Sequence, residues 1–152
     1  MYTGSKAQSG AGSILNILTG SPLEPTLVGE ITKLTQSGKK NQTADCTNLE
    51  STADEFIGTL LSPGNYAITM NRVPGDPGQI LILAAFNTYP PSTASFSIVL
   101  RKSPTQTTTG DTYSFVAIVE EFNDISDVDP KKQIMTTASL KVSGPIGFVQ
   151  GS

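Results

Sequence analysis

Histidine and tryptophan are absent from the 152-residue sequence, and Cys46 is its single cysteine. Without histidine, Ser–His and Cys–His catalysis and every histidine-containing metal site are excluded within this chain. A single cysteine excludes an intramolecular disulfide, and it also excludes zinc-finger and iron–sulfur ligand sets. An enzyme built from carboxylates or lysines remains open at this point.

Long apolar runs and an excess of basic residues are also missing. The net charge is −3 at pH 7 and the pI is about 4.8, which argues against a surface built to bind nucleic acid. No apolar run approaches the ~20 residues that a membrane-spanning helix needs, and the N-terminus has no charged-then-apolar signal pattern. We therefore expect no membrane association, and the length predicts one domain.

The first residues are rich in glycine, serine and alanine. This composition predicts a flexible N-terminal arm over residues 1–13, followed by a single β domain over residues 14–152. The arm is either mobile or ordered on a partner.

An apolar run with helix-start signals stands out from the rest of the sequence. Asp76 can cap a helix, Pro77 suits the first helical position, and Gln79 follows the cap by three residues, as in a capping box. Every residue from Ile80 to Phe86 is apolar, and a Pro-Pro pair lies shortly beyond. These features predict a helix over about residues 77–88, although periodicity alone also allows a buried core strand.

A short helix that is apolar all round has to be covered on every side. We expect the sheet to cover one face of this helix and a neighbouring subunit to cover the other. The residues predicted to pack the helix or to contact that subunit are Asp76, Gln79, Ile82, Leu83 and Phe86.

Alternation of apolar and polar residues predicts strands over most of the remaining chain. The predicted strands are Ile14–Leu18, Leu27–Leu34, Asn65–Val73, Ala94–Arg101, Thr112–Phe122, Gln133–Ser143 and a short edge strand around Ile146–Val149. The 112–122 strand is apolar on both faces, which predicts cover on both sides along part of it. The expected fold class is mainly β, an antiparallel β sandwich or barrel with one flanking helix.

Residues 36–64 are polar and have no sustained period, so they are predicted to form a long loop. Loops longer than about 12–15 residues are usually functional or disordered. Phe56, Ile57, Leu60 and Leu61 form small apolar patches within it. The segment is either a surface loop whose hairpin folds on the domain or a segment that becomes ordered against another subunit.

Acidic residues offer the only candidate for an ion site. Asp124, Asp127 and Asp129 are spaced as calcium ligands can be, but solvated loop carboxylates are the favoured interpretation. Glu120 and Glu121 are adjacent on a predicted strand and so point to opposite faces, which prevents them from acting as an acid–base pair. We expect no catalytic residues, no metal and no cofactor.

A series of motifs then occurs in a recognisable order. It comprises GEIT at Gly29–Thr32, DCTNLES at Asp45–Ser51, the strand from Tyr66, PGDPGQILILAAF at Pro74–Phe86, FSIVL at Phe96–Leu100, the strand around Phe115–Val119 and LKVSGPI at Leu140–Ile146. In this order the sequence resembles the major tail tube protein of long-tailed bacteriophages with non-contractile, lambda-like tails. The resemblance covers roughly Glu24–Ile146.

The resemblance implies a structural virion protein and no enzyme. Protomers would form hexameric rings that stack into a hollow tail tube, and strands from all protomers would join into an inner barrel through which DNA passes without specific binding. The tape measure, tail terminator and distal tail proteins would be partners, with assembly in the bacterial host cytoplasm. The residues expected to contact the next ring are Asp45, Thr47, Ser51, Phe56, Ile57, Leu60 and Leu61.

Three other functions stay open. Similar tube domains occur in contractile tails and type VI secretion. An immunoglobulin-like β binding module would be a monomer with exposed aromatic residues, and four Tyr and six Phe make it less favoured. A carboxylate-dependent glycosidase is disfavoured because no acids are well placed.

The acidic balance of the sequence suits a DNA conduit, since a negatively charged lumen repels phosphate.

Overall fold

The computed structural model describes residues 10–90, 92–103 and 106–152. Within these residues the chain forms ten strands and one helix. The strands are β1 (Ile14–Thr19), β2 (Glu24–Leu27), β3 (Ile31–Ser37), β4 (Lys40–Asp45), β5 (Phe56–Ser62), β6 (Asn65–Asn71), β7 (Ala94–Val99), β8 (Thr112–Asp127), β9 (Met135–Val142) and β10 (Gly147–Val149). The helix, α1, spans Pro77–Asn87. The predicted fold class, mainly β and antiparallel with one helix, is confirmed.

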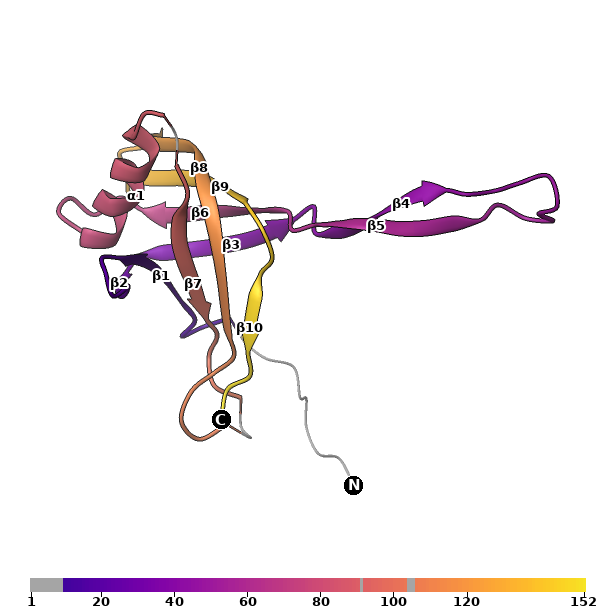
Figure 1. The fold of residues 1–152 in the computed structure, drawn as a ribbon. Helices are drawn as coiled ribbons and strands as arrows, with labels where there is room; N and C mark the ends of the chain where they lie inside the picture. The colour runs from indigo at the N-terminus through magenta and orange to yellow at the C-terminus, as the bar shows by residue number, and fades with distance from the viewer. Residues whose placement is uncertain (1–9, 91, 104–105) are drawn as a thin grey trace, which may run out of the picture.

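One antiparallel sheet forms the body, in the order β2-β1-β7-β8-β9-β6-β3, with β10 also paired to β8. Figure 1 shows that the sheet folds over itself, because β7 and β10 run steeply across the direction of β3 and β6. The long strand β8 belongs to both layers and has a register shift between Val119 and Glu121. Such bulges bend strands and so allow a sheet to turn a corner.

The core lies between the two layers and is built by the inward-facing residues of each strand. The buried apolar residues are Leu15, Ile17, Val28, Tyr66, Ile68, Met70, Ile82, Phe96, Ile98, Phe115, Ala117, Val119, Ala138, Leu140 and Val142. At its centre the Phe115 ring stacks on Tyr66, with centroids 4.6 Å apart, and on Phe96, at 5.6 Å. Cover on both sides was predicted for part of β8; on the other face Ile118 is half-buried and Val116 is exposed in the subunit.

Helix α1 begins where the capping pattern predicts. The Asp76 carboxylate accepts a hydrogen bond from the Gln79 N–H (3.0 Å), and Pro77 opens the helix. Ile82 is fully buried, and the Phe86 ring lies 6.4 Å from that of Phe122 on β8. Ile80 is exposed, so the subunit by itself does not cover the helix on all sides.

The helix start is joined to two other parts of the sheet by a polar cluster, which we call the latch and define as Asp76 and Gln79. Asp76 also accepts from the Gly29 N–H (3.2 Å). The Gln79 side chain donates to the carbonyls of Gly29 (3.0 Å) and Asn71 (2.9 Å) and accepts from the Val73 N–H (3.2 Å). The latch therefore ties α1 to the β2–β3 connection and to the end of β6.

The latch explains where the predicted strand over Leu27–Leu34 was wrong. β2 ends at Leu27 and β3 begins only at Ile31, because Val28 turns into the core and Gly29 is held by the latch. Glu30 then takes a positive φ of 60°, which no strand residue adopts. A second boundary also differs, since β8 runs on to Asp127 through residues predicted as an acidic loop.

Replacing Gln79 by leucine should destabilise the fold without changing side-chain bulk greatly. The carbonyls of Gly29 and Asn71 and the N–H of Val73 would lose their partner, and each buried polar group left unpaired costs about 1–3 kcal/mol. We expect the free energy of unfolding to fall by at least about 2 kcal/mol, measured by urea unfolding of unassembled protein followed by circular dichroism.

The matched control is Ile80→Gln on the same helix. Ile80 is exposed, so this substitution should change the free energy of unfolding by no more than about 0.5 kcal/mol. Equal effects of the two variants would show that the latch has no special role.

Candidate assembly surfaces

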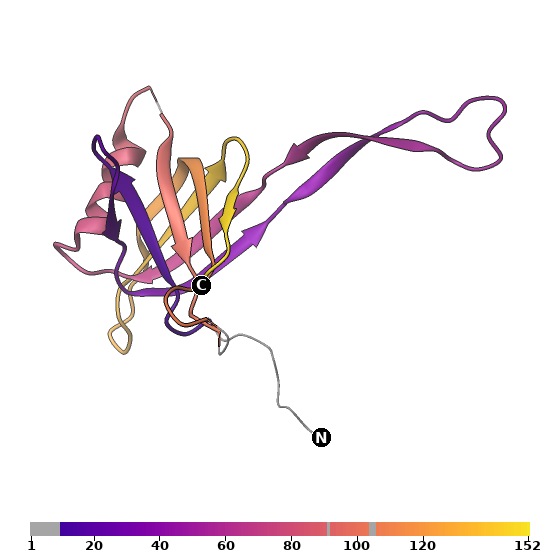
Figure 2. The same ribbon diagram turned by 60° about the horizontal axis from the view of Figure 1, so that its bottom comes forward.

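The segment predicted as a long loop over residues 36–64 is mostly a β hairpin. Strands β4 and β5 pair from Lys40–Ser62 to Asp45–Phe56 and form their own two-stranded sheet. Figures 1 and 2 show the hairpin leaving the body, with no other described segment beside it. The loop prediction was wrong for these strands. Strand β4 is polar apart from Ala44, and the apolar residues of β5 come in consecutive pairs, so neither strand shows a two-residue period.

The hairpin continues the body strands β3 and β6 beyond a pair of glycines. Ser37 and Asn65 form the last pair of the body sheet at this point. Gly38 and Gly64 then have φ values of 76° and 86°, and a Cβ on Gly64 would lie 2.3 Å from the Ser37 carbonyl oxygen. This junction, which we call the root, interrupts the ladder and separates the hairpin from the body.

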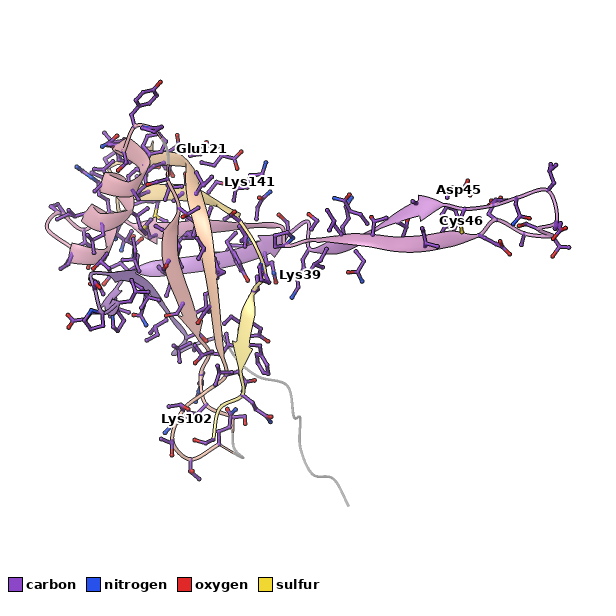
Figure 3. The ribbon with its side chains drawn as sticks, in the orientation of Figure 1. Lys39, Asp45, Cys46, Lys102, Glu121 and Lys141 are labelled. Atoms are coloured by element: carbon purple, nitrogen blue, oxygen red, sulfur yellow. The ribbon has the colours of Figure 1, made fainter. Side chains whose placement is uncertain are left out.

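The tip of the hairpin is a polar turn with its own hydrogen bonds. Asp45 accepts from the Thr47 N–H (2.9 Å), the Thr47 hydroxyl accepts from the Glu55 N–H (2.8 Å), and the Ser51 hydroxyl donates to the Glu55 carboxylate (3.0 Å). Hydrogen bonds from the Thr47 side chain, and then from its N–H, lower the pKa of Asp45. Figure 3 shows Asp45 and the exposed Cys46 far out on the hairpin.

Four large apolar side chains on the hairpin are open to solvent. Phe56 is 60% exposed, Ile57 54%, Leu60 79% and Leu61 48%. An isolated two-stranded hairpin is marginally stable in water, and burying each side chain of this size would contribute about 1.5–3 kcal/mol. The hairpin therefore has a strong physical reason to bind another surface.

A second surface is the outward side of the layer β3-β6-β9-β8. Strand register aligns its residues in three rows: Ser37, Asn65, Lys141 and Ile118; Thr35, Ala67, Ser139 and Glu121; and Lys33, Thr69, Thr137 and Asn123. Small hydroxyl and amide side chains dominate these rows, which we call the polar face. Its charged residues are Lys33, Lys141 and Glu121, the last two of which are labelled in Figure 3.

The layer that carries the polar face has an unpaired edge on each side. Strand β3 pairs only with β6. From Ile118 onward β8 pairs only with β9, because the pairing of β7 with β8 ends at Ala94 and Ala117. Both statements apply to the described residues. Beside the β3 edge is a groove of about 550 Å³, whose lining includes the apolar residues Leu15, Val28, Ile31, Leu34 and Ile98.

The two groups of predicted contact residues lie at opposite ends of the body, the helix at one end and the hairpin beyond the other (Figure 1). Asp76, Gln79 and Ile82 are engaged within the subunit, whereas Phe86 is partly exposed. Contact of Leu83 or Phe86 with a neighbouring subunit stays a prediction. The polar face was missed in the sequence because its rows are defined only once strand register is known.

The acidic residues are divided between a strand and the turn that follows it. Asp124 and Asp127 lie on β8, and Asp129 accepts from the Lys131 N–H (2.9 Å) in the following turn. In the described part of the chain, no three Cys, Asp or Glu side chains gather closely enough to hold a metal ion. No helix among the described residues is long and apolar enough to span a bilayer.

No protein-family model and no curated protein sequence matches the chain. Its fold does match solved structures. A chain of the anti-feeding prophage tube-terminating cap aligns with a TM-score of 0.73 at 10% identity, over 99% of this chain and 96% of that chain. A chain from the tail of an empty gene transfer agent particle, determined with C6 symmetry, gives 0.71 at 12%, over 94% and 99%.

A third match comes from the sheath–tube complex of PVC, an extracellular contractile injection system. It has a TM-score of 0.68 at 10% identity, over 95% of this chain and 92% of that chain. At such identities the likeness shows a shared fold.

Hydrogen exchange should separate the hairpin from the body. In unassembled protein we expect amides of β4 and β5 to exchange much faster than those of β6 and β9, because the hairpin has few buried neighbours. Once a partner covers the hairpin, its amides should become protected. Equal protection of hairpin and body before assembly would contradict a role for the hairpin as a docking element.

Proposed function

We propose that this chain is the tube-forming subunit of a phage-like tail, in which hexameric rings stack into a hollow tube. The observation that carries the proposal is the pair of unpaired edges on the layer β3-β6-β9-β8. The two edges belong to different strands, so pairing β3 of one copy with β8 of the next is a head-to-tail contact. Contacts of this kind generate closed rings when the rotation between copies is suitable.

In such a ring the polar face lines the channel. Its hydroxyl and amide side chains are compatible with water and offer few cations to phosphate. The three rows contain two lysines and one glutamate, so this lining is close to neutral. The overall charge of the chain had predicted a negative lining. Sparse charge of either sign also suits a channel that DNA crosses without binding.

The groove beside β3 supports the same arrangement. A neighbour that pairs with the β3 edge would also cover the apolar residues next to it, among them Ile31 and Leu34. Free strand edges with apolar surroundings are otherwise an aggregation hazard. A closed ring removes all of these edges, because each copy covers the edge of the next.

The hairpin supports stacking of one ring on the next. From its root to its tip it spans about ten residues, which at ~3.3 Å per residue is roughly 30 Å. That reach takes the tip well into an adjacent ring. The exposed apolar residues of β5 would then be buried between rings, with Asp45, Thr47 and Ser51 near them.

The fold matches are compatible with more than one kind of tail, since they include contractile injection systems and a gene transfer agent tail. We favour the non-contractile, lambda-like setting because of the ordered motifs from Gly29–Thr32 to Leu140–Ile146. Its location would be the virion tail, with tape measure, terminator and distal tail proteins as partners. The tube of a contractile tail is the alternative.

Electron microscopy of the purified protein tests the proposal. At high concentration the wild-type chain should form tubes whose end views have sixfold symmetry. In a second protein, residues 38–64 are replaced by Asn-Gly. This variant should fold, because a two-residue turn can join the directly paired Ser37 and Asn65. It should not form tubes, because it lacks the hairpin. We expect this variant to stop at single rings or smaller species.

Circular dichroism and thermal unfolding of the shortened variant provide the control for folding. A wild-type protein that stays a compact monomer at every concentration, even with a tail initiator present, would overturn the proposed function. Wild-type rings that never stack would instead indicate a subunit that caps a tube.

A further inference from the structure

We infer that Lys33 of one copy forms an ion pair with Glu121 of the next copy, across the seam where the β3 edge meets the β8 edge. The inference rests on the proposed function, because it requires a closed ring. The proposed function needs only that the two free edges meet, whereas the ion pair determines the register in which they meet.

The two residues lie on the polar face, at opposite edges of the layer. Lys33 is on the edge strand β3, Glu121 is on the part of β8 that has a free edge, and both are exposed. Strands β6 and β9 lie between them. At about 4.8 Å per strand, three strand spacings separate the two residues by roughly 14 Å. The pair therefore cannot form within one subunit.

A β bulge turns each of these side chains onto the polar face. The register shifts between Ile31 and Lys33 in β3 and between Val119 and Glu121 in β8. Ile31 and Val119 face the core, so strict alternation would direct the residue two places further on toward the core as well. The extra residue in each bulge reverses this direction. Two separate irregularities thus bring one cation and one anion to the same face.

The Glu121 carboxylate is oriented toward the row that contains Lys33. It accepts a hydrogen bond from the Asn123 side-chain amide (2.7 Å), which also donates to the Thr137 hydroxyl (3.2 Å). Asn123 and Thr137 stand in the same row as Lys33. Lys141, the other cation of the polar face, stands in the row on the opposite side of Glu121. The carboxylate therefore leans away from the lysine of its own subunit.

Strand direction limits how the two edges can meet. Each strand of the layer β3-β6-β9-β8 runs antiparallel to its neighbour, so β8 and the β3 of an equally oriented next copy are antiparallel too. Their stagger must be an even number of residues, or the polar side chains would face opposite sides. With no stagger, Lys33 of the next copy lies opposite Asn123 and diagonal to Glu121. With a stagger of two residues toward the start of β8, it lies opposite Glu121. Long side chains reach across both arrangements, and the ion pair restricts the seam to these two registers.

Charge on an edge strand also has a simpler use, because lysine there deters unwanted strand pairing. A glutamate at position 33 would serve that purpose equally well. The sign of the charge at this position therefore distinguishes the two roles.

Charge reversal tests the inference. Lys33→Glu alone or Glu121→Lys alone places like charges at the seam. Each should raise the protein concentration needed for ring and tube formation about tenfold, which corresponds to ~1.4 kcal/mol per subunit. The double variant restores opposite charges and should return that concentration to within about threefold of the wild-type value. Thermal unfolding of the unassembled variants checks that these exposed substitutions leave the fold intact.

Lys102→Glu is the matched control, since Lys102 is exposed in the loop between β7 and β8 and lies outside the polar face. Combined with Glu121→Lys, it gives the same net charge as the swapped pair, yet it should not restore assembly. Sodium chloride provides a second signature. The difference between wild type and Lys33→Glu should shrink as the salt concentration rises, because salt screens exposed charges.

Zero-length cross-linking of the wild-type protein locates the pair without relying on any variant. A carbodiimide that joins amines to carboxylates should link Lys33 to Glu121 between chains in assembled tubes, and mass spectrometry of the peptides identifies the link. Unassembled protein should not give it, because the two residues are too far apart within one subunit.

The outcomes separate the inference from the proposed function. Wild-type protein that never forms rings overturns the proposed function, and the ion pair with it. Rings that tolerate Lys33→Glu, a swapped pair that fails to restore assembly, or a cross-link from Lys33 to Asp127 in place of Glu121 overturn the ion pair and leave the tube role standing.

Discussion

The hydrogen bonds of Gln79 are the constraint on which the rest of the subunit depends. One buried side chain joins the start of α1 to the β2–β3 connection and to the end of β6. The approach is so close that a Cβ on Gly78 would lie 2.4 Å from the Leu27 carbonyl oxygen. By holding β2 and β3 apart, the latch sends β1 and β2 into one layer and β3 into the other, and so leaves β3 as an edge.

Some elements could be located from signals between residues close together in the sequence. The Asp76 cap and Pro77 located α1, and the alternation at Tyr66, Ile68 and Met70 located β6. The break after Leu27 was not predictable, because it depends on contacts with Asp76 and Gln79, which lie about fifty residues further along the chain. Tertiary contacts of this kind override strand propensity.

The candidate surfaces were predictable only in part, for a related reason. Phe56, Ile57, Leu60 and Leu61 attracted attention as apolar residues in a polar segment, yet their arrangement on two faces follows from pairing with Asp45, Ala44 and Asn41. The polar face is still less visible in sequence, since threonine, serine and asparagine are common in loops. Only the register of β3, β6, β9 and β8 brings them together.

If the chain forms a tail tube, as proposed, the root of the hairpin separates two mechanical requirements of that tube. Ring closure through strand edges is rigid, because each added ladder extends a sheet that is already packed on the core. Contacts between rings need to yield when a tail bends. Gly38 and Gly64, both with positive φ, interrupt the ladder between the body and the hairpin, and glycine tolerates φ values that other residues rarely adopt. On the proposed function, the hairpin could therefore keep its contact with the next ring while its own body tilts.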